Sequence, residues 1–278
     1  MKLGIMQGRL VPPEDGRFQS FPRQRWRDEF ALAAAAGLDT IEWIWDAYGE
    51  NENPLGTDAG IREMQRLCGV HRVAIESICA DWFMDFPLVG LDAATAQIRW
   101  RKLEWLMDRG AQLGINRIVV PFVDSAAMHT AHDTAAVAAG IGALAGAIER
   151  TGVELHLETS LPADGFAALL ARLVHPGIKV NYDSGNSASL GYRPREEFAA
   201  YGARVGSLHL KDRRRGAGTV PLGDGDTDFD GLFEALAAHH YRGDFILQVA
   251  RGNAGDEFAW TRANVQAARG MMQRLVHA

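Results

Sequence analysis

Short apolar runs alternate with longer stretches of helical periodicity along the whole chain. Eight of the apolar runs have the length and the bounding residues of buried parallel strands, and each is followed by a turn and a helical pattern. The predicted strands are Lys2–Gln7, Thr40–Trp43, Val73–Cys79, Arg117–Phe122, Val153–Thr159, Ile178–Asp183, Val205–Leu210 and Phe245–Ala250. Strict alternation requires right-handed crossovers and a parallel sheet, and eight units favour closure into a (β/α)₈ barrel.

Residues that commonly terminate helices follow several of the stretches with helical periodicity. The predicted helices are Trp26–Ala36, Thr57–Cys68, Ala93–Leu113, Ala135–Arg150, Gly165–Leu173, Arg195–Tyr201, Phe229–His239 and Asp256–Val276. Gly37, Gly114 and Gly152 follow three of them, where glycine commonly terminates a helix. No Gly-x-Gly-x-x-Gly follows the first strand, which argues against a dinucleotide-binding doubly wound sheet.

We expect a single domain over residues 1–278, because one such barrel typically needs roughly 250 residues and no Pro/Ser-rich linker interrupts the chain. The longest irregular segments all follow predicted strands. They are Gly8–Arg23, Asp46–Gly56, Asp81–Asp92 and Arg213–Asp228. Segments in this position lie at the carboxyl ends of the barrel strands, where active sites are found. We therefore expect them to build a substrate pocket.

The composition restricts the kinds of molecule that this protein is expected to bind. The formal net charge of -6 argues against duplex DNA or an anionic membrane surface, since both require an excess of Lys and Arg on the contact face. The only two cysteines, Cys68 and Cys79, are expected to be buried thiols in a reducing compartment. The amino terminus has no secretory pattern, and no window is expected to be apolar enough to span a bilayer. We therefore predict a soluble cytoplasmic protein.

Polar residues stand at the ends of four successive predicted strands. They are Glu158, Asp183, His209 and Gln248. Because the carboxyl ends of barrel strands meet around one point, we expect the four side chains to hold one divalent metal ion. Oxygen ligands with one imidazole suit Mn²⁺, Mg²⁺, Co²⁺ or Zn²⁺. Taken singly, Asp183 would start a turn before Gly185, and Gln248 would be a hydrogen-bonded core residue.

Several motifs carry a resemblance to a known family. The opening GIMQGR, the YDSGN turn, the HLKD stretch and the LGDGDTDF segment together resemble the sugar isomerase/epimerase branch of the xylose isomerase-like TIM barrels, over nearly the whole chain. The resemblance implies a divalent metal held by carboxylates of the fifth and sixth strands, a histidine of the seventh and usually a glutamate of the eighth. Glu158, Asp183 and His209 match the first three positions.

The fourth position departs from the family pattern. Relatives of the ketose 3-epimerase type carry a glutamate where this chain has Gln248. An amide oxygen still ligates a hard metal, but it cannot accept the proton that a second catalytic carboxylate would take. The sequence therefore favours metal binding more strongly than epimerisation.

The first candidate for the catalytic base is Glu158, acting through its non-ligating oxygen. His156 and Lys211 share the inward parity of Glu158 and His209 along their strands, so either is a candidate acid or base. The alternative for His156 is a hydrogen-bonded core residue. Further acid–base candidates of lower rank are Glu42, Glu76 and Asp81.

Candidate substrate-binding residues follow the predicted strands. Arg213 lies in an arginine run that is either a solvated loop or an anion clamp for a sugar phosphate or sugar acid, and Arg9 would join such a clamp. Gln7 ends the first strand and would line the same pocket. Trp43 and Trp82 are candidates for a sugar-stacking wall, with core packing as the alternative.

The predicted function is metal-dependent isomerisation or epimerisation of a small-molecule sugar or sugar phosphate. A base would remove a proton next to a metal-chelated carbonyl and leave an enediolate. A lyase or dehydratase on the same barrel is the main alternative. A DNA-repair endonuclease relative would need more histidines at the strand ends, and a non-catalytic sugar-binding barrel also stays open. We expect no nucleic-acid or membrane partner. Homo-oligomers are common among relatives, although nothing in the sequence identifies an interface.

Overall fold

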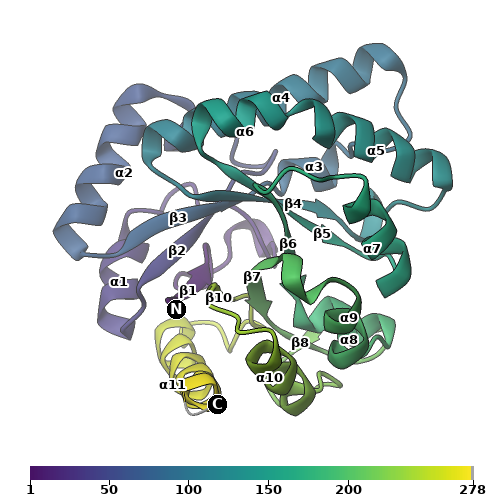
Figure 1. Cartoon of the computed structure of the whole chain (residues 1–278). Helices are drawn as coiled ribbons and strands as arrows, with labels where there is room; N and C mark the ends of the chain where they lie inside the picture. The colour runs from purple at the N-terminus through teal and green to yellow at the C-terminus, as the bar shows by residue number, and fades with distance from the viewer. Residues whose placement is uncertain (277–278) are drawn as a thin grey trace.

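Eight parallel strands close into a barrel in the computed structural model, which describes residues 1–276 (Figure 1). The strands are β1 (Leu3–Met6), β2 (Thr40–Ile44), β3 (Ala74–Cys79), β4 (Arg117–Phe122), β5 (Glu154–Thr159), β6 (Ile178–Asp183), β7 (Val205–Leu210) and β10 (Asp244–Leu247). Around the barrel they follow the order β1, β10, β7, β6, β5, β4, β3, β2. Each overlaps one predicted strand, so the predicted (β/α)₈ TIM barrel is confirmed.

Helices cover the outside of the strands (Figure 1). They are α1 (Asp28–Ala36), α2 (Asp58–His71), α4 (Ala93–Leu113), α5 (Ala131–Ala143), α6 (Ala145–Thr151), α7 (Ala163–Ala171), α9 (Pro194–Tyr201), α10 (Phe229–Ala238) and α11 (Glu257–Val276). Gly37, Gly114 and Gly152 end α1, α4 and α6 with φ of 78°, 94° and 70°. This left-handed conformation favours glycine, and the predicted helix ends are confirmed.

One predicted helix is divided in two. The stretch 135–150 forms α5 and α6, because the backbone of Leu144 (φ −84°, ψ 2°) leaves the helical region between them. The segment Ala131–Thr151 also has a mean hydropathy of 1.3 and the length to cross a membrane. The expectation that no window would be apolar enough is therefore wrong. A single such segment is weak evidence for a span, because a core helix of a soluble protein passes the same test.

Two short helices were not predicted. The helix α3 (Trp82–Asp85) lies in a segment expected to be irregular, and α8 (Ser184–Leu190) begins where a turn was expected. The side chain of Asp183 caps α8, because its Oδ1 accepts a hydrogen bond of 2.8 Å from the backbone N–H of Asn186. The turn that was the alternative role of Asp183 is therefore the first turn of a helix.

The HLKD and LGDGDTDF motifs form one structural unit. Asp212 lies in the two-residue strand β8 (Asp212–Arg213), which pairs with β9 (Thr219–Val220) in a hairpin. The Asp212 carboxylate accepts hydrogen bonds of 2.8, 2.9 and 3.1 Å from the backbone N–H groups of Gly223, Gly225 and Thr227. A side chain at Gly225 would collide with this carboxylate. The glycine-rich segment is thus wrapped around one buried aspartate.

The two cysteines are both free, with Cys79 buried and Cys68 half-buried. Cys79 is thus the buried thiol that was expected, whereas Cys68 is less buried than predicted.

Trp43 lies in an aromatic cluster between β2 and α1. Its side chain is fully buried, and its ring centroid lies 5.6, 5.7 and 6.2 Å from those of Phe21, Trp26 and Phe30. The indole N–H donates a 3.0 Å hydrogen bond to Asn53 Oδ1. Trp43 is therefore a packing residue, and the prediction that it belongs to a sugar-stacking wall is wrong.

Replacing Trp43 with alanine is expected to lower the free energy of unfolding by about 3–5 kcal/mol, because it leaves a cavity and removes one of the two hydrogen bonds that Asn53 Oδ1 accepts. Urea denaturation measures the change. The matched control is Val174→Ala, since Val174 is 86% exposed and its truncation should shift stability by less than about 0.5 kcal/mol. An equally small effect at both positions would contradict the packing role of Trp43.

Candidate metal and substrate site

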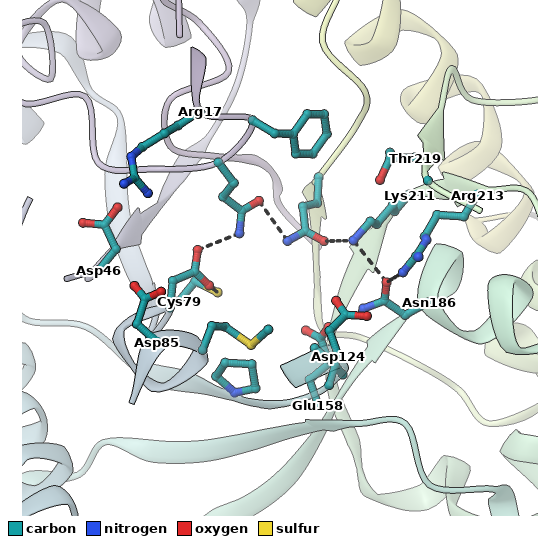
Figure 2. A pocket seen from close by; sticks show the side chains of 18 of the residues that line it. Arg17, Asp46, Cys79, Asp85, Asp124, Glu158, Asn186, Lys211, Arg213 and Thr219 are labelled. Carbon is teal, nitrogen blue, oxygen red and sulfur yellow. Dashed lines mark hydrogen bonds between the residues drawn. The ribbon is translucent and has the colours of Figure 1, made fainter. Parts of the chain in front are cut away.

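A cavity of about 620 Å³ opens at the carboxyl ends of the barrel strands (Figure 2). Loops and strand ends from most of the barrel contribute to its wall, as the sequence predicted for this face. The side chains central to the site are Gln19, Asp81, Glu158, Asn186, Lys211 and Gln248. A volume of this size accommodates a small-molecule ligand.

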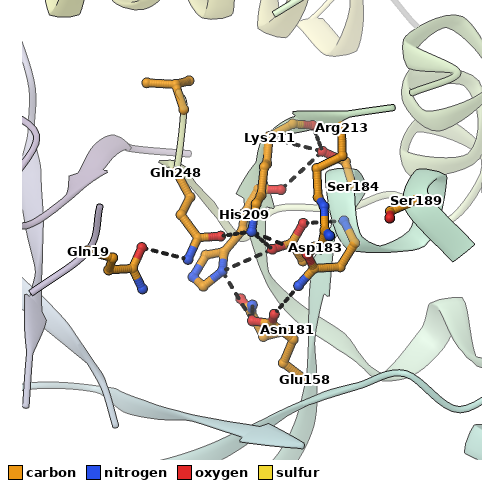
Figure 3. Close-up of polar contacts among 12 residues, drawn as sticks. Gln19, Glu158, Asn181, Asp183, Ser184, Ser189, His209, Lys211, Arg213 and Gln248 are labelled. Carbon is orange, nitrogen blue, oxygen red and sulfur yellow. Dashed lines mark hydrogen bonds and ion pairs between the residues drawn. The ribbon is translucent and has the colours of Figure 1, made fainter. Parts of the chain in front are cut away.

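Glu158, Asp183 and His209 converge at the base of the site (Figure 3). They offer one ligand atom each, and these atoms lie within 4.8 Å of one another. Asp183 and His209 are direct register partners on β6 and β7, while Glu158 stands near the end of the adjacent β5. All three residues are buried. The barrel therefore brings together three of the four side chains that were predicted as ligands.

The donor set fits a divalent cation. His209 Nδ1 is buried and has no hydrogen-bond partner among residues 1–276, although it lies 3.2 Å from Glu158 Oε2 and 3.9 Å from Asp183 Oδ2. Burial acts to lower the pKa of His209, but Glu42 and Glu158 outweigh it and raise that pKa to about 10. The surrounding carboxylates thus stabilise positive charge at the point where a metal ion would be held.

Glu42 fixes the orientation of the His209 ring. Its Oε1 lies 2.6 Å from His209 Nε2, and both side chains are fully buried. Burial acts to raise the pKa of Glu42, but the charge and the hydrogen bond of His209 hold it below the usual value. The pair leaves Nδ1 directed at Glu158 and Asp183. Glu42, predicted as a lower-ranked acid or base, lies behind the histidine, where a carboxylate commonly orients a metal-binding imidazole.

Carboxylates outnumber the Lys211 ammonium group in this region. Glu42, Glu158 and Asp183 bring three carboxylates to the site, and Lys211 brings one ammonium group. A divalent ion beside a neutral His209 would complete the neutralisation, which is the condition under which buried charges are stable.

Two asparagines hold the carboxylate of Glu158. Asn181 Nδ2 donates to Oε2 at 2.9 Å, and Asn186 Nδ2 donates to Oε1 at 2.7 Å. Asn181 lies on β6 and Asn186 on α8. Neither was singled out from the sequence, although the YDSGN motif contained Asn186. The two amides fix the Glu158 side chain in one position.

Lys211 and Gln248 lie side by side above the three converging residues (Figure 3). Lys211 Nζ donates to Asp183 Oδ2 at 3.2 Å, to Asn186 Oδ1 at 3.2 Å and to Gln248 Oε1 at 3.0 Å. Gln248 lies one residue beyond β10 and lines the cavity. Its amide oxygen accepts from Lys211 and its amide nitrogen donates to Gln19 at 3.2 Å, and its role as a fourth ligand stays a prediction.

His156 lies deeper in the barrel than the cavity. Its Nδ1 is 2.7 Å from Ser207 Oγ, and its Nε2 is 2.9 Å from Glu154 Oε2. Burial lowers the pKa of His156 to about 4. The prediction that His156 is a catalytic acid or base is therefore replaced by the alternative, a hydrogen-bonded core residue. His156 points into the barrel like Glu158, but it lies two residues earlier on β5 and therefore below the cavity. Glu76 on β3 pairs with Lys2 instead of facing the cavity.

Three predicted substrate-binding residues do not line the cavity. Gln7 is fully buried and accepts a 3.0 Å hydrogen bond from the Ile44 backbone. Arg9 is buried and directs its guanidinium to Val249 O and to neighbouring loop atoms. Trp82 donates to Glu50 Oε2 at 2.8 Å. Each of these side chains already forms a hydrogen bond within the protein.

Arg213 does line the cavity. Its NH1 donates to Asn186 Oδ1 at 2.8 Å, and its Nε donates to Ala217 O at 2.9 Å. These bonds hold the guanidinium at the wall formed by the hairpin. Arg17 lines the opposite side of the cavity (Figure 2) and stacks on the Tyr48 ring at 4.3 Å.

The comparisons with known proteins agree on one family. Residues 30–272 match the family model described as xylose isomerase-like TIM barrel. The L-ribulose-5-phosphate 3-epimerase UlaE of Shigella flexneri serotype 5b is 25% identical over 274 residues, which cover 89% of this chain and 92% of that protein.

Solved structures share the same barrel. The xylose isomerase domain protein from Planctomyces limnophilus has a TM-score of 0.79 at 16% identity, with 100% of this chain and 99% of that chain covered. A D-psicose 3-epimerase determined in the presence of D-fructose has a TM-score of 0.75 at 18% identity, with 98% and 99% covered. At these identities the structural likeness shows the fold alone.

Changing Glu42 to glutamine is expected to weaken divalent-metal binding about 10–100-fold, because the carboxylate that orients and charges His209 is lost while all the ligands remain. Titration calorimetry with Mn²⁺ and with Zn²⁺ measures the affinity. Glu76→Gln on the neighbouring β3 is the matched control and should bind like the parent. Equal affinity of the Glu42 variant and the parent would show that the ring does not depend on this carboxylate.

Proposed function

Because this chain belongs to the xylose isomerase-like TIM-barrel family, we propose that it is a divalent-metal-dependent enzyme that isomerises or epimerises a small sugar. The observation that carries the proposal is the convergence of Glu158, Asp183 and His209 on one point beside a cavity of sugar size. The similarity to a ketose-phosphate epimerase supports the same reaction class. A sugar substrate also suits a wall of amides, carboxylates and guanidinium groups, which offers many hydrogen-bond partners.

Glu158 is the proposed base. Its two oxygens are held by Asn181 and Asn186, so it needs no reorganisation before it takes a proton from the carbon next to the substrate carbonyl. A divalent ion held by Glu158, Asp183, His209 and Gln248 would supply a Lewis acid that stabilises the negative charge of the enediolate.

Lys211 and Arg213 are proposed to bind and orient the substrate. All three protons of the Lys211 ammonium group are donated to acceptors within the site, which makes it a fixed positive charge for substrate oxygens. Arg213 and Arg17 line opposite sides of the cavity (Figure 2), and either guanidinium group would meet a phosphate if the sugar carries one.

Glu158→Gln is expected to lower proton exchange at the carbon next to the carbonyl about 10²–10⁴-fold, since general-base catalysis is lost. The assay follows deuterium incorporation by NMR in D₂O with Mn²⁺, using D-fructose, D-psicose, L-ribulose and L-ribulose 5-phosphate as probes. Metal content is measured in parallel because Glu158 is also a proposed ligand.

The control for this variant is Glu154→Gln, which changes the same residue type at the other end of β5 and should retain exchange within threefold. Exchange of none of the probes by the parent would contradict the proposed function. Loss of water from a probe in place of carbonyl redistribution would indicate the lyase alternative.

Chelation with EDTA is expected to abolish the exchange, and added Mn²⁺ or Zn²⁺ should restore it, because the enediolate would lose its counter-charge. Asp183→Ala/His209→Ala should not be rescued by metal, since two of the proposed ligands are missing. Full activity of the chelated parent, with metal absent by mass spectrometry, would contradict metal dependence.

A further inference from the structure

Gln248 leaves the site with one obvious base. Inversion of configuration at a carbon requires that a proton be removed from one face and another be delivered to the opposite face. Glu158 can act on only one of these faces, and the amide of Gln248 cannot give or take the second proton. A second acid–base group on a different wall of the cavity would be needed for epimerisation.

Asp81 stands on such a wall. It follows β3, is half-buried and lines the same cavity as Glu158. Because β4 lies between β3 and β5 in the barrel, the two carboxylates come from non-adjacent strands. Figure 2 shows Cys79, whose thiol donates to Asp81, on the side of the cavity away from Lys211 and Asn186.

A chain of hydrogen bonds links Asp81 to the opposite wall. Gln19 Nε2 donates to Asp81 Oδ2 at 2.7 Å, and Gln19 Oε1 accepts from Gln248 Nε2 at 3.2 Å. Arg9 NH2 donates to the same Gln19 oxygen at 2.8 Å, which keeps the amide N–H₂ of Gln19 turned toward Asp81. Arg9 thus orients Gln19, and Gln19 positions Asp81 at the cavity surface.

The other candidate groups are less suited to this role. The Lys211 protons are held by three acceptors, and His156 is buried beneath the cavity. The Cys79 thiol donates to Asp81 at 3.1 Å, and burial raises its pKa well above the usual value. Burial also raises the pKa of Asp81, to about 6, so this carboxyl group exists in both protonation states near neutral pH.

We propose that Asp81 is the second acid–base residue and that, together with Glu158, it makes the enzyme an epimerase. The inference rests on the proposed function. Glu158 takes the proton as the C–H bond breaks, and the electron pair forms the C=C bond of the enediolate. Asp81 then gives its proton to the other face of the same carbon, a new C–H bond forms and the C=O bond is restored. The proton on Glu158 returns to solvent and Asp81 regains one, so no oxidant or reductant is required.

The test uses Asp81→Asn with both members of an epimer pair. The amide keeps the shape of the side chain, and its oxygen still accepts from Gln19. Each of D-fructose and D-psicose, and each of L-ribulose 5-phosphate and its C3 epimer, is incubated in D₂O with Mn²⁺. Deuterium incorporation and epimer formation are measured separately by NMR. Asp85→Asn is the matched control, because it removes one charge from the exposed rim of the same wall.

Asp81→Asn is expected to bind metal like the parent and to lose epimer formation at least 100-fold. It should still exchange deuterium into the one epimer whose hydrogen faces Glu158, and into that epimer only. Asp85→Asn should epimerise within threefold of the parent. One-sided exchange is a result that a merely structural role of Asp81 would not produce.

Unchanged epimerisation by Asp81→Asn would overturn the proposal. Equal loss of exchange from both epimers would overturn it as well, since this would mean that Asp81 only maintains the site. Absence of exchange in the parent with every probe would instead refute the proposed function, and the role of Asp81 with it. The parent assay therefore separates the two failures.

Discussion

The hydrogen bond between Glu42 and His209 joins residues 167 positions apart in the sequence, in the interior of the barrel. A carboxylate without exposure to water is stable only beside a positive or strongly donating group, and a buried imidazole needs a partner for each nitrogen. Glu42 provides the partner of His209 Nε2, and His209 provides the group beside which the Glu42 carboxylate is stable. The same bond turns His209 Nδ1 toward Glu158 and Asp183, so the geometry of the site depends on the closed barrel, which brings the non-adjacent strands β2 and β7 together across its interior.

Strand positions and the convergence of Glu158, Asp183 and His209 could be predicted because they follow from local patterns. Short apolar runs define the strands, and the strand ends of a closed barrel share one face. Depth within the barrel could not be predicted in the same way. His156 and Glu158 point inward from the same strand, yet only Glu158 reaches the cavity, since the residue two positions earlier lies one layer lower. The alternation of side chains along a strand therefore predicts which residues point into the barrel, but it does not predict which of them reach the cavity.

The alternation of side chains along a strand also explains why the predicted sugar-stacking role of Trp43 is wrong. Glu42 faces the barrel interior, so its neighbour Trp43 must face the helices, where the aromatic cluster surrounds it. The supporting residues were harder to foresee. Asn181 and Asn186 act only through Glu158, and Gln19 acts through Asp81, so their roles depend on contacts between distant segments.

The amide of Gln248 gives the hydrogen-bond chain a direction, because it accepts from Lys211 through its oxygen and donates to Gln19 through its nitrogen. A carboxylate at this position could accept from Lys211, but it would place an oxygen against the Gln19 oxygen. Gln19 would then have to turn over and lose its donation to Asp81. Positions 19, 81 and 248 are therefore expected to vary together among relatives, so that a glutamate at 248 occurs with a different pair of residues at the other two.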